Sequence, residues 1–67
     1  MATSTTIGEN IQKRRMKLGL SQEDFAQKSD VKYTTLTKIE SGVIKKPSVL
    51  IMAKIAKALG VSIEDLL

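Results

Sequence analysis

The chain has 67 residues, of which 42% are hydrophobic, and it contains neither cysteine nor histidine. This length holds one domain with little room for an internal active site, and the two missing residue types exclude disulfides, the usual zinc sites and Cys or His nucleophiles. Eleven Lys and Arg against seven Asp and Glu give a net charge of +4, which is compatible with an anionic partner.

A first helix is predicted over residues 7–18. Thr6 and Glu9 have the spacing of a capping box, in which each residue satisfies the other's free backbone N–H. Gly19 is suited to the left-handed conformation that commonly ends a helix. The apolar stripe of this helix consists of Ile7, Ile11 and Leu18, with Met16 nearby.

A second, shorter helix is predicted over residues 22–29. Ser21, followed three residues later by Asp24, marks its N-terminus. The next residues are polar and few, and Asp30 tolerates turn conformations that β-branched residues avoid. A tight turn is therefore expected. The apolar residues here are Phe25, Ala26 and Val31.

A third helix is predicted over residues 33–40, with Gly42 closing it. Only Leu36 and Ile39 are apolar at helical spacing, and most other positions are polar. This helix is therefore expected to be mostly exposed.

Two further helical segments are predicted over residues 49–59 and 63–67. Ser48 caps the first of them, and Ser62 with Asp65 starts the second, which is a single turn. The inner side of the longer segment is predicted to carry Val49, Met52, Ile55, Ala56 and Leu59.

The pattern as a whole predicts an all-α fold of five short helices, without a strand or an internal repeat. Residues 1–6 are expected to form a flexible tail and residues 7–67 a single domain. No apolar run approaches the about 18 residues of a membrane span, and the N-terminus lacks the order of a secretion signal.

Two short helices joined by a tight turn, the second mostly polar, form a layout in which one helix braces the other in the major groove of DNA. At this point the sequence resembles the Cro/CI-type (XRE-like) helix-turn-helix family of phage and bacterial repressors. The resemblance covers about residues 7–67 and implies a compact, five-helix, lambda-repressor-like fold. The runs that carry it are residues 20–26, 31–42, 47–48 and 54–62, which read LSQEDFA, VKYTTLTKIESG, PS and KIAKALGVS.

The resemblance implies base contacts for Lys32, Tyr33, Thr34 and Lys38 on the third helix, with Thr37 placed to help. The chemistry is suitable, because lysine donates to guanine O6 and N7 and a threonine methyl meets a thymine methyl. The alternative is an ordinary solvated helix face. Relatives often carry Gln or Ser where this chain has Lys32 and Tyr33, so their operator preferences are not transferred.

Phosphate contacts are expected at Gln22, Lys45 and Lys46. Gln22 matches a phosphate-contacting position of the family and lies beside the free N–H groups of a helix N-terminus. Residues 31–59 contain six lysines and one acid, so the positive field is concentrated in this half. Alternatively, Gln22 is simply a favourable early-helix residue. The loop that holds Lys45 and Lys46 is one residue longer than is common, which leaves open which lysine meets a phosphate.

Arg15 and Glu40 match a pair that forms an ion pair in some relatives. A bidentate contact between guanidinium and carboxylate would fix the angle of the third helix. We interpret Glu40 as structural, because an isolated carboxylate without a second acid, His or Cys offers nothing for general acid–base catalysis. The chain is therefore not expected to be an enzyme.

Several apolar residues lie where relatives are often polar, namely Val43 and Ile44 in a loop and Leu50 and Ile51 on the fourth helix. Neighbouring apolar groups in water commonly mark an interface. The alternative is that the core simply reaches further in this sequence. The other residues expected to join a two-fold contact are Ile63, Leu66 and Leu67.

These observations predict a transcriptional regulator that binds a pseudo-palindromic operator in double-stranded DNA as a homodimer, at least on DNA. No cofactor, metal, membrane or small-molecule ligand is expected, and the resemblance implies a cytoplasmic protein that joins the nucleoid when bound. Two alternatives stay open. One is a protein-interaction module, similar to an antitoxin or coactivator, and the other is the N-terminal DNA-targeting module of a longer protein.

Overall fold

Short polar residues begin four of the five helical elements within residues 6–67. In the computed structural model, which describes residues 6–67, Thr6, Ser21, Ser48 and Ser62 each accept a hydrogen bond from a backbone N–H in the first turn that follows. The elements are α1 (Ile7–Lys17), α2 (Gln22–Ser29), α3 (Tyr33–Glu40), α4 (Val49–Leu59) and the 3-10 turn η1 (Ile63–Leu66).

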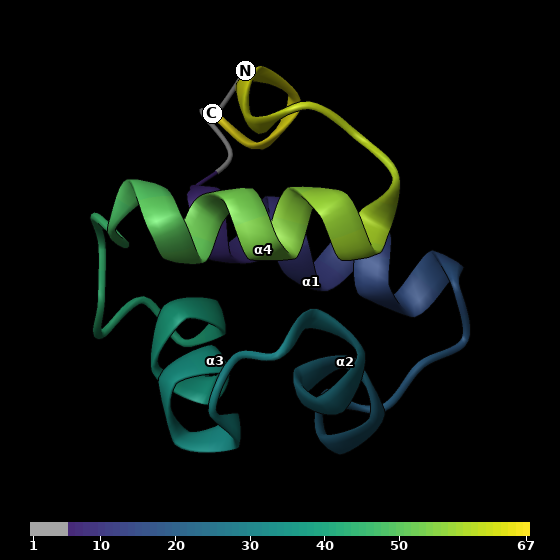
Figure 1. Ribbon diagram of the computed structural model, residues 1–67. Coiled ribbons are helices and arrows are strands. Elements are labelled where there is room, and N and C mark those ends of the chain that lie inside the picture. The colour runs from purple at the N-terminus through teal and green to yellow at the C-terminus, as the bar shows by residue number, and fades with distance from the viewer. Residues whose placement is uncertain (1–5) are drawn as a thin grey trace, which may run out of the picture.

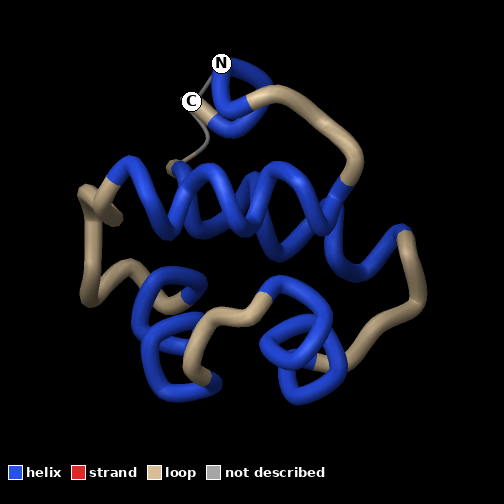
Figure 2. The backbone as a smooth tube through the Cα atoms, viewed as in Figure 1, coloured by secondary structure: helices blue, strands red, loops and turns tan. Residues whose placement is uncertain are grey.

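The described part of the chain is all-helical, as predicted, and Figure 2 shows helices and loops only over residues 6–67. The expected fifth helix is a 3-10 turn, so residues 6–67 form four α-helices rather than five. The expected tail, residues 1–6, lies outside the described residues except for Thr6, which is the N-cap of α1.

The turn between α2 and α3 comprises residues 30–32. Asp30 adopts the left-handed conformation, with φ 59°, and the N–H of Val31 donates to the carbonyl of Ala26. This arrangement closes α2 and redirects the chain at once into α3. Val31, within the turn, is buried and belongs to the apolar core.

α2 and α3 lie beside each other on one side of the molecule, and α1 and α4 lie on the other (Figure 1). α3 packs against both α1 and α2, whereas α4 packs against α1, α2 and η1. The core is therefore enclosed by all five elements. Its buried apolar residues are Ile11, Phe25, Ala26, Val31, Leu36, Ile39, Met52, Ile55, Ala56 and Leu66.

Three apolar residues that were expected on inner helix faces are exposed. Leu18 and Met16 lie at the end of α1, and Val49 is the first residue of α4. Each stands at a helix terminus, where neighbouring elements no longer cover the apolar stripe. Periodicity predicts which face of a helix is apolar, but the packing partners decide how much of that face is covered.

The turn η1 is attached to α1 by polar contacts. Asn10 Nδ2 donates to the carbonyl of Asp65 at 2.9 Å, and Arg14 Nη2 donates to the same oxygen at 3.4 Å. The backbone N–H of Ser62, followed by its hydroxyl, lowers the pKa of the Asp65 carboxyl by hydrogen bonding to it. Leu66 is thereby carried into the core, where its side chain is 0% exposed.

Gly8 allows α1 to approach α3 closely. An added Cβ would overlap the carbonyl oxygen of Ile39 and would lie 3.1 Å from that of Glu40. The first turn of α1 therefore touches the backbone at the end of α3, with no space for a side chain between them. This contact sets the separation of the two helices.

Candidate nucleic-acid interface

The outward face of α3 carries polar and basic side chains. Tyr33, Thr34 and Lys38 are exposed, Thr37 is half-buried, and Lys32 is exposed directly before the helix. Positions 33, 34, 37 and 38 share one side of an α-helix because of its 3.6-residue repeat. The structure thus brings together the five residues expected to contact bases.

The opposite face of α3 holds it to the rest of the domain. Leu36 and Ile39 are almost completely buried, and Glu40 is buried beside them. The side chains that would face a ligand are therefore separate from those that make the core.

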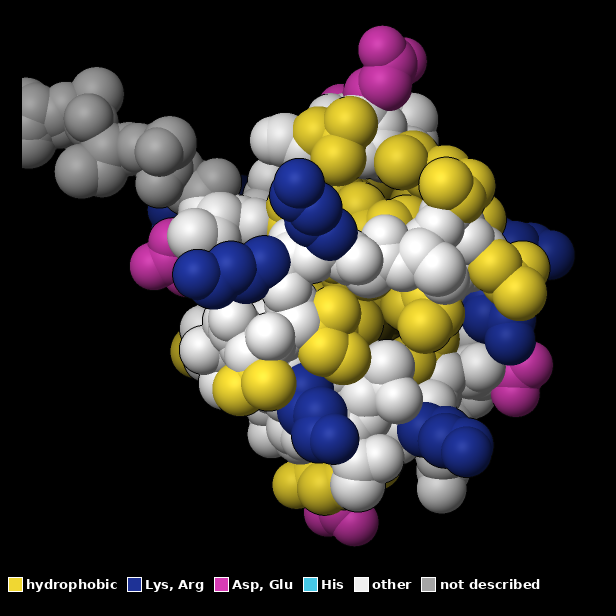
Figure 3. Space-filling model, turned by 90° about the vertical axis from the view of Figure 1, so that its left-hand side faces the viewer, with side chains coloured by type: hydrophobic (Ala, Val, Ile, Leu, Met, Phe, Trp, Pro, Cys, Tyr) yellow, Lys and Arg dark blue, Asp and Glu magenta, His cyan; other side chains and the backbone are white. Residues whose placement is uncertain are grey.

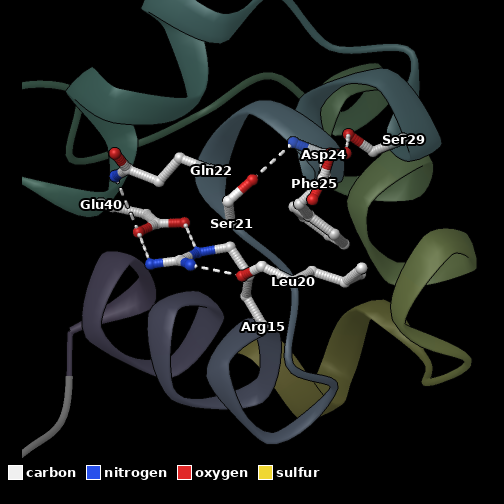
Figure 4. A network of polar contacts seen from close by, with 8 residues as sticks. All are labelled: Arg15, Leu20, Ser21, Gln22, Asp24, Phe25, Ser29 and Glu40. Atoms are coloured by element: carbon white, nitrogen blue, oxygen red, sulfur yellow. Dashed lines mark hydrogen bonds and ion pairs between the residues drawn. The ribbon is translucent and has the colours of Figure 1, made fainter.

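Arg15 and Glu40 form a two-point ion pair between α1 and the end of α3, visible in Figure 4. Arg15 Nε lies 2.8 Å from Glu40 Oε2, and Nη2 lies 3.0 Å from Oε1. The side chains are 10% and 2% exposed, so both charges are largely removed from water. A buried pair needs good geometry and further hydrogen bonds to offset its desolvation cost.

Two further hydrogen bonds complete this network. Gln22 Nε2, on the first residue of α2, donates to Glu40 Oε1 at 3.1 Å. Arg15 Nη1 donates to the carbonyl of Leu20 at 2.7 Å, in the connection between α1 and α2 (Figure 4). Glu40 therefore accepts from both α1 and α2, and the network fixes the two helices of the motif against α1.

The N-terminus of α3 differs from the other four because its cap residue, Lys32, makes no side-chain hydrogen bond to the helix. The first N–H groups of a helix have no partner within the helix. At α3 the first backbone N–H groups therefore have no side-chain oxygen to donate to, whereas at the other elements a Ser or Thr oxygen accepts such a hydrogen bond.

Replacing Lys32 by serine is expected to raise the free energy of unfolding by about 1 kcal/mol, because the hydroxyl would cap α3. The same change is expected to weaken DNA binding, since it removes a cation from the outward face. Urea denaturation and a DNA titration measure the two effects. Lys32→Ala is the matched control, because it removes the charge without supplying an acceptor. Equal stability of the two variants would contradict the capping argument.

The lysines expected to contact DNA form no ion pair with a carboxylate within residues 6–67. Among residues 6–67, the lysine within ion-pairing distance of a carboxylate is Lys54, whose Nζ lies 3.4 Å from Asp30 Oδ2. Lys45 and Lys46 are exposed in the loop between α3 and α4. The N–H of Ile44 donates to the carbonyl of Lys38 at 3.0 Å, which holds the start of this loop against α3.

The comparison with known proteins identifies the family. Residues 11–66 match the helix-turn-helix family. The chain belongs to the Cro/CI-type helix-turn-helix family. This is a family of DNA-binding transcription regulators and not of enzymes.

A solved structure has a similar fold. The crystal structure of SinR, the master regulator for biofilm formation, in complex with DNA superposes with a TM-score of 0.88 at 31% sequence identity. The match covers 91% of this chain and 97% of that chain. In this helix-turn-helix domain, no helix within residues 6–67 is long and apolar enough to cross a bilayer.

The apolar residues expected at an interface divide into three groups in the helix-turn-helix domain. Val43 and Leu50 are 71% and 67% exposed, the first in the loop before α4 and the second in the first turn of that helix. Figure 3 shows the side of the molecule on which this loop lies, and there basic side chains lie among apolar ones. Leu66 is fully buried in the core, so the prediction that it joins an interface is wrong. The half-buried residues Ile44, Ile51 and Ile63 pack against the core, and exposed Val49 and Leu67 add to the apolar surface.

Three features of the helix-turn-helix site were not predicted from the sequence. They are the close approach at Gly8, the hydrogen bond from Gln22 to Glu40 and that from Arg15 to the carbonyl of Leu20. An isolated glycine inside a predicted helix was the available signal for the first. No local pattern reports the other two, because each joins segments that meet only in the folded chain.

Proposed function

We propose that this domain belongs to a sequence-specific transcriptional regulator that binds a pseudo-palindromic operator as a dimer, with α3 in the major groove. The observation that carries the proposal is the separation of the two faces of α3. The inner face is buried and ion-paired through Glu40, while Thr34 and Lys38 on the outer face are exposed. The likeness to SinR, which was crystallised in complex with DNA, supports DNA as the ligand.

In this proposal the contacts fall into two classes. Side chains on the outer face of α3 meet base edges and supply sequence preference. Side chains at the N-terminus of α2 and in the loop before α4 meet phosphates and set the register. The base contacts are Lys32, Tyr33, Thr34, Thr37 and Lys38, and the phosphate contacts are Gln22, Lys45 and Lys46.

The amide of Gln22 can serve both the fold and the DNA. Its Nε2 carries two protons, one of which is donated to Glu40 Oε1. The second remains for a phosphate oxygen at the α2 N-terminus, where the helix dipole already favours negative charge. The ion-pair network would then hold this donor in place before DNA arrives.

Selection from a randomised duplex pool at two salt concentrations tests the proposal. We expect enrichment of an inverted repeat whose half-sites lie about 34 Å apart, one turn of the double helix. Enrichment of no sequence, with affinity that collapses as salt rises, would mean that the basic surface attracts phosphate without reading bases. That result would favour a protein-interaction module instead.

Replacing Lys38 and Lys46 separately by alanine distinguishes the two classes of contact. Lys38→Ala is expected to cost about 1–3 kcal/mol of binding free energy and to relax preference at one base pair. Lys46→Ala is expected to weaken all sequences alike and to reduce the slope of affinity against salt by about 1. Titrations of several operator variants at graded salt measure both. Identical effects of the two variants on every sequence would contradict the assignment.

We also propose that the exposed apolar residues around the α3–α4 loop form the contact between the two copies. Leu50→Glu is expected to weaken binding to the inverted repeat about tenfold, because a charge would be buried in that contact, while binding to one half-site stays unchanged. Titrations of whole and half operators measure this, and mass measurement on DNA gives the stoichiometry. Met16→Glu, at an exposed apolar position of α1, is the matched control. A strictly monomeric complex on the full operator would contradict the proposal.

A further inference from the structure

Two threonines on the outer face of α3 differ in how their hydroxyl groups are engaged. Thr37 Oγ1 donates to the backbone carbonyl of Thr34 at 2.9 Å, one turn earlier in the helix. The hydroxyl of Thr34 makes no hydrogen bond within residues 6–67, and its side chain is exposed. The same residue type therefore presents different chemistry at two neighbouring positions.

The bond to the helix backbone limits what Thr37 can offer to DNA. A hydroxyl carries a single proton, so a group that donates it to a main-chain carbonyl cannot also donate to a base. Threonine in a helix adopts this arrangement readily, because it satisfies the hydroxyl locally. The Thr37 side chain can then offer the major groove its methyl group and, through the lone pairs of Oγ1, an acceptor, but no donor.

We infer that Thr37 recognises the 5-methyl group of a pyrimidine through its own Cγ2 methyl, whereas Thr34 uses its free hydroxyl as a polar contact. The inference rests on the proposed function, because it requires α3 to lie in the major groove. There thymine is the natural base that displays a methyl group, and 5-methylcytosine displays the same group at the same position. Cytosine methylation at that position would then strengthen binding.

Single replacements of thymine by deoxyuridine in the selected operator test this directly, since each removes one methyl group and no hydrogen-bonding atom. Wild-type protein is expected to lose about three- to fivefold in affinity at one position of each half-site, the effect of one buried methyl. Fluorescence anisotropy at constant salt measures each loss. At the same position, 5-methylcytosine paired with guanine is expected to bind more tightly than cytosine paired with guanine.

Variants of Thr37 connect the effect to its methyl. Thr37→Ser keeps the hydroxyl and removes the methyl, so it is expected to bind the thymine operator as weakly as wild-type protein binds the deoxyuridine operator. Its affinity should not change when thymine is replaced by deoxyuridine. Thr37→Val keeps the methyl and is expected to retain the wild-type sensitivity. Thr34→Ser is the matched control, and it is also expected to retain that sensitivity. Thermal unfolding of each variant verifies that it is folded.

Three outcomes would overturn the inference. The first is an operator that contains no thymine, or in which every thymine methyl group can be removed without loss of affinity. The second is a Thr37→Ser variant whose affinity still falls when thymine is replaced by deoxyuridine. The third is a Thr37→Val variant that loses affinity while Thr37→Ser does not. The last would mean that the hydroxyl oxygen accepts a hydrogen bond from a base amino group. Failure of the proposed function is distinguishable, because in that case selection yields no operator at all.

Discussion

Replacing Glu40 by alanine is expected to lower the free energy of unfolding by about 3–5 kcal/mol, because the Arg15 guanidinium would remain buried without its counter-charge. Gln22 would lose its partner in the same change. A domain of this size has a total stability of only about 3–10 kcal/mol, so a large fraction of the variant should be unfolded at room temperature. Urea denaturation followed by circular dichroism measures the loss.

The double variant Arg15→Met/Glu40→Leu shows how much of the lost stability comes from the unpaired buried charge and how much from the loss of packing. Replacing both partners of a buried pair by apolar residues is often neutral, so we expect the double variant to recover most of the lost stability. Its operator affinity should nevertheless stay below that of the wild type, because Gln22 has no acceptor there. A Glu40→Ala variant within about 1 kcal/mol of the wild type would contradict the account of a buried, mutually dependent pair.

Replacing Gly8 by alanine is expected to lower the free energy of unfolding by about 3 kcal/mol, the upper end of ordinary overpacking. The sign is the reverse of the usual one, because alanine in place of glycine within a helix ordinarily stabilises it by about 0.5–1 kcal/mol. Here the new Cβ would overlap the backbone carbonyl of Ile39, and backbone yields less readily than a side chain. α1 must move away from α3 to accommodate it.

Thermal and urea denaturation of Gly8→Ala measure the cost, and Gln12→Ala in the same helix is the control, because Gln12 is exposed. The control should differ little from the wild type. Since the displaced contact lies at the end of α3, the Gly8 variant should also bind DNA less well when temperature is lowered enough to keep it folded. A gain in stability for Gly8→Ala would show that α1 and α3 are not held at this distance.

The elements could be predicted from sequence because their ends depend on local chemistry. Ser21 and Ser48 mark helix starts within a residue of where the structure has them, and Asp30 adopts the left-handed turn expected of it. Which apolar side chains other elements bury was less predictable. Leu66 was expected in a two-fold contact and lies in the core, while Val49 was expected on the inner side of its helix and is exposed. Both outcomes depend on how η1 and α4 pack.

The part of the candidate site that lies on one face of a single helix could be predicted from the sequence. Positions on the outer face of α3 follow from helical periodicity once Leu36 and Ile39 are recognised as the inner face. The ion pair between Arg15 and Glu40 came from the family resemblance. Its additional link to Gln22, and the hydroxyl of Thr37 turned onto the helix backbone, are properties of three-dimensional geometry that periodicity does not report.

The division of α3 into an inner and an outer face also bears on how such a domain can change over evolutionary time. Leu36, Ile39 and Glu40 attach the helix to the domain, and Thr34 and Lys38 take no part in the core. If the domain acts as proposed, substitutions on the outer face can therefore alter the preferred operator at little cost to folding. A duplicated copy of the gene would reach a new regulatory target by a few such steps, each of them a folded protein, while the scaffold stays as it is.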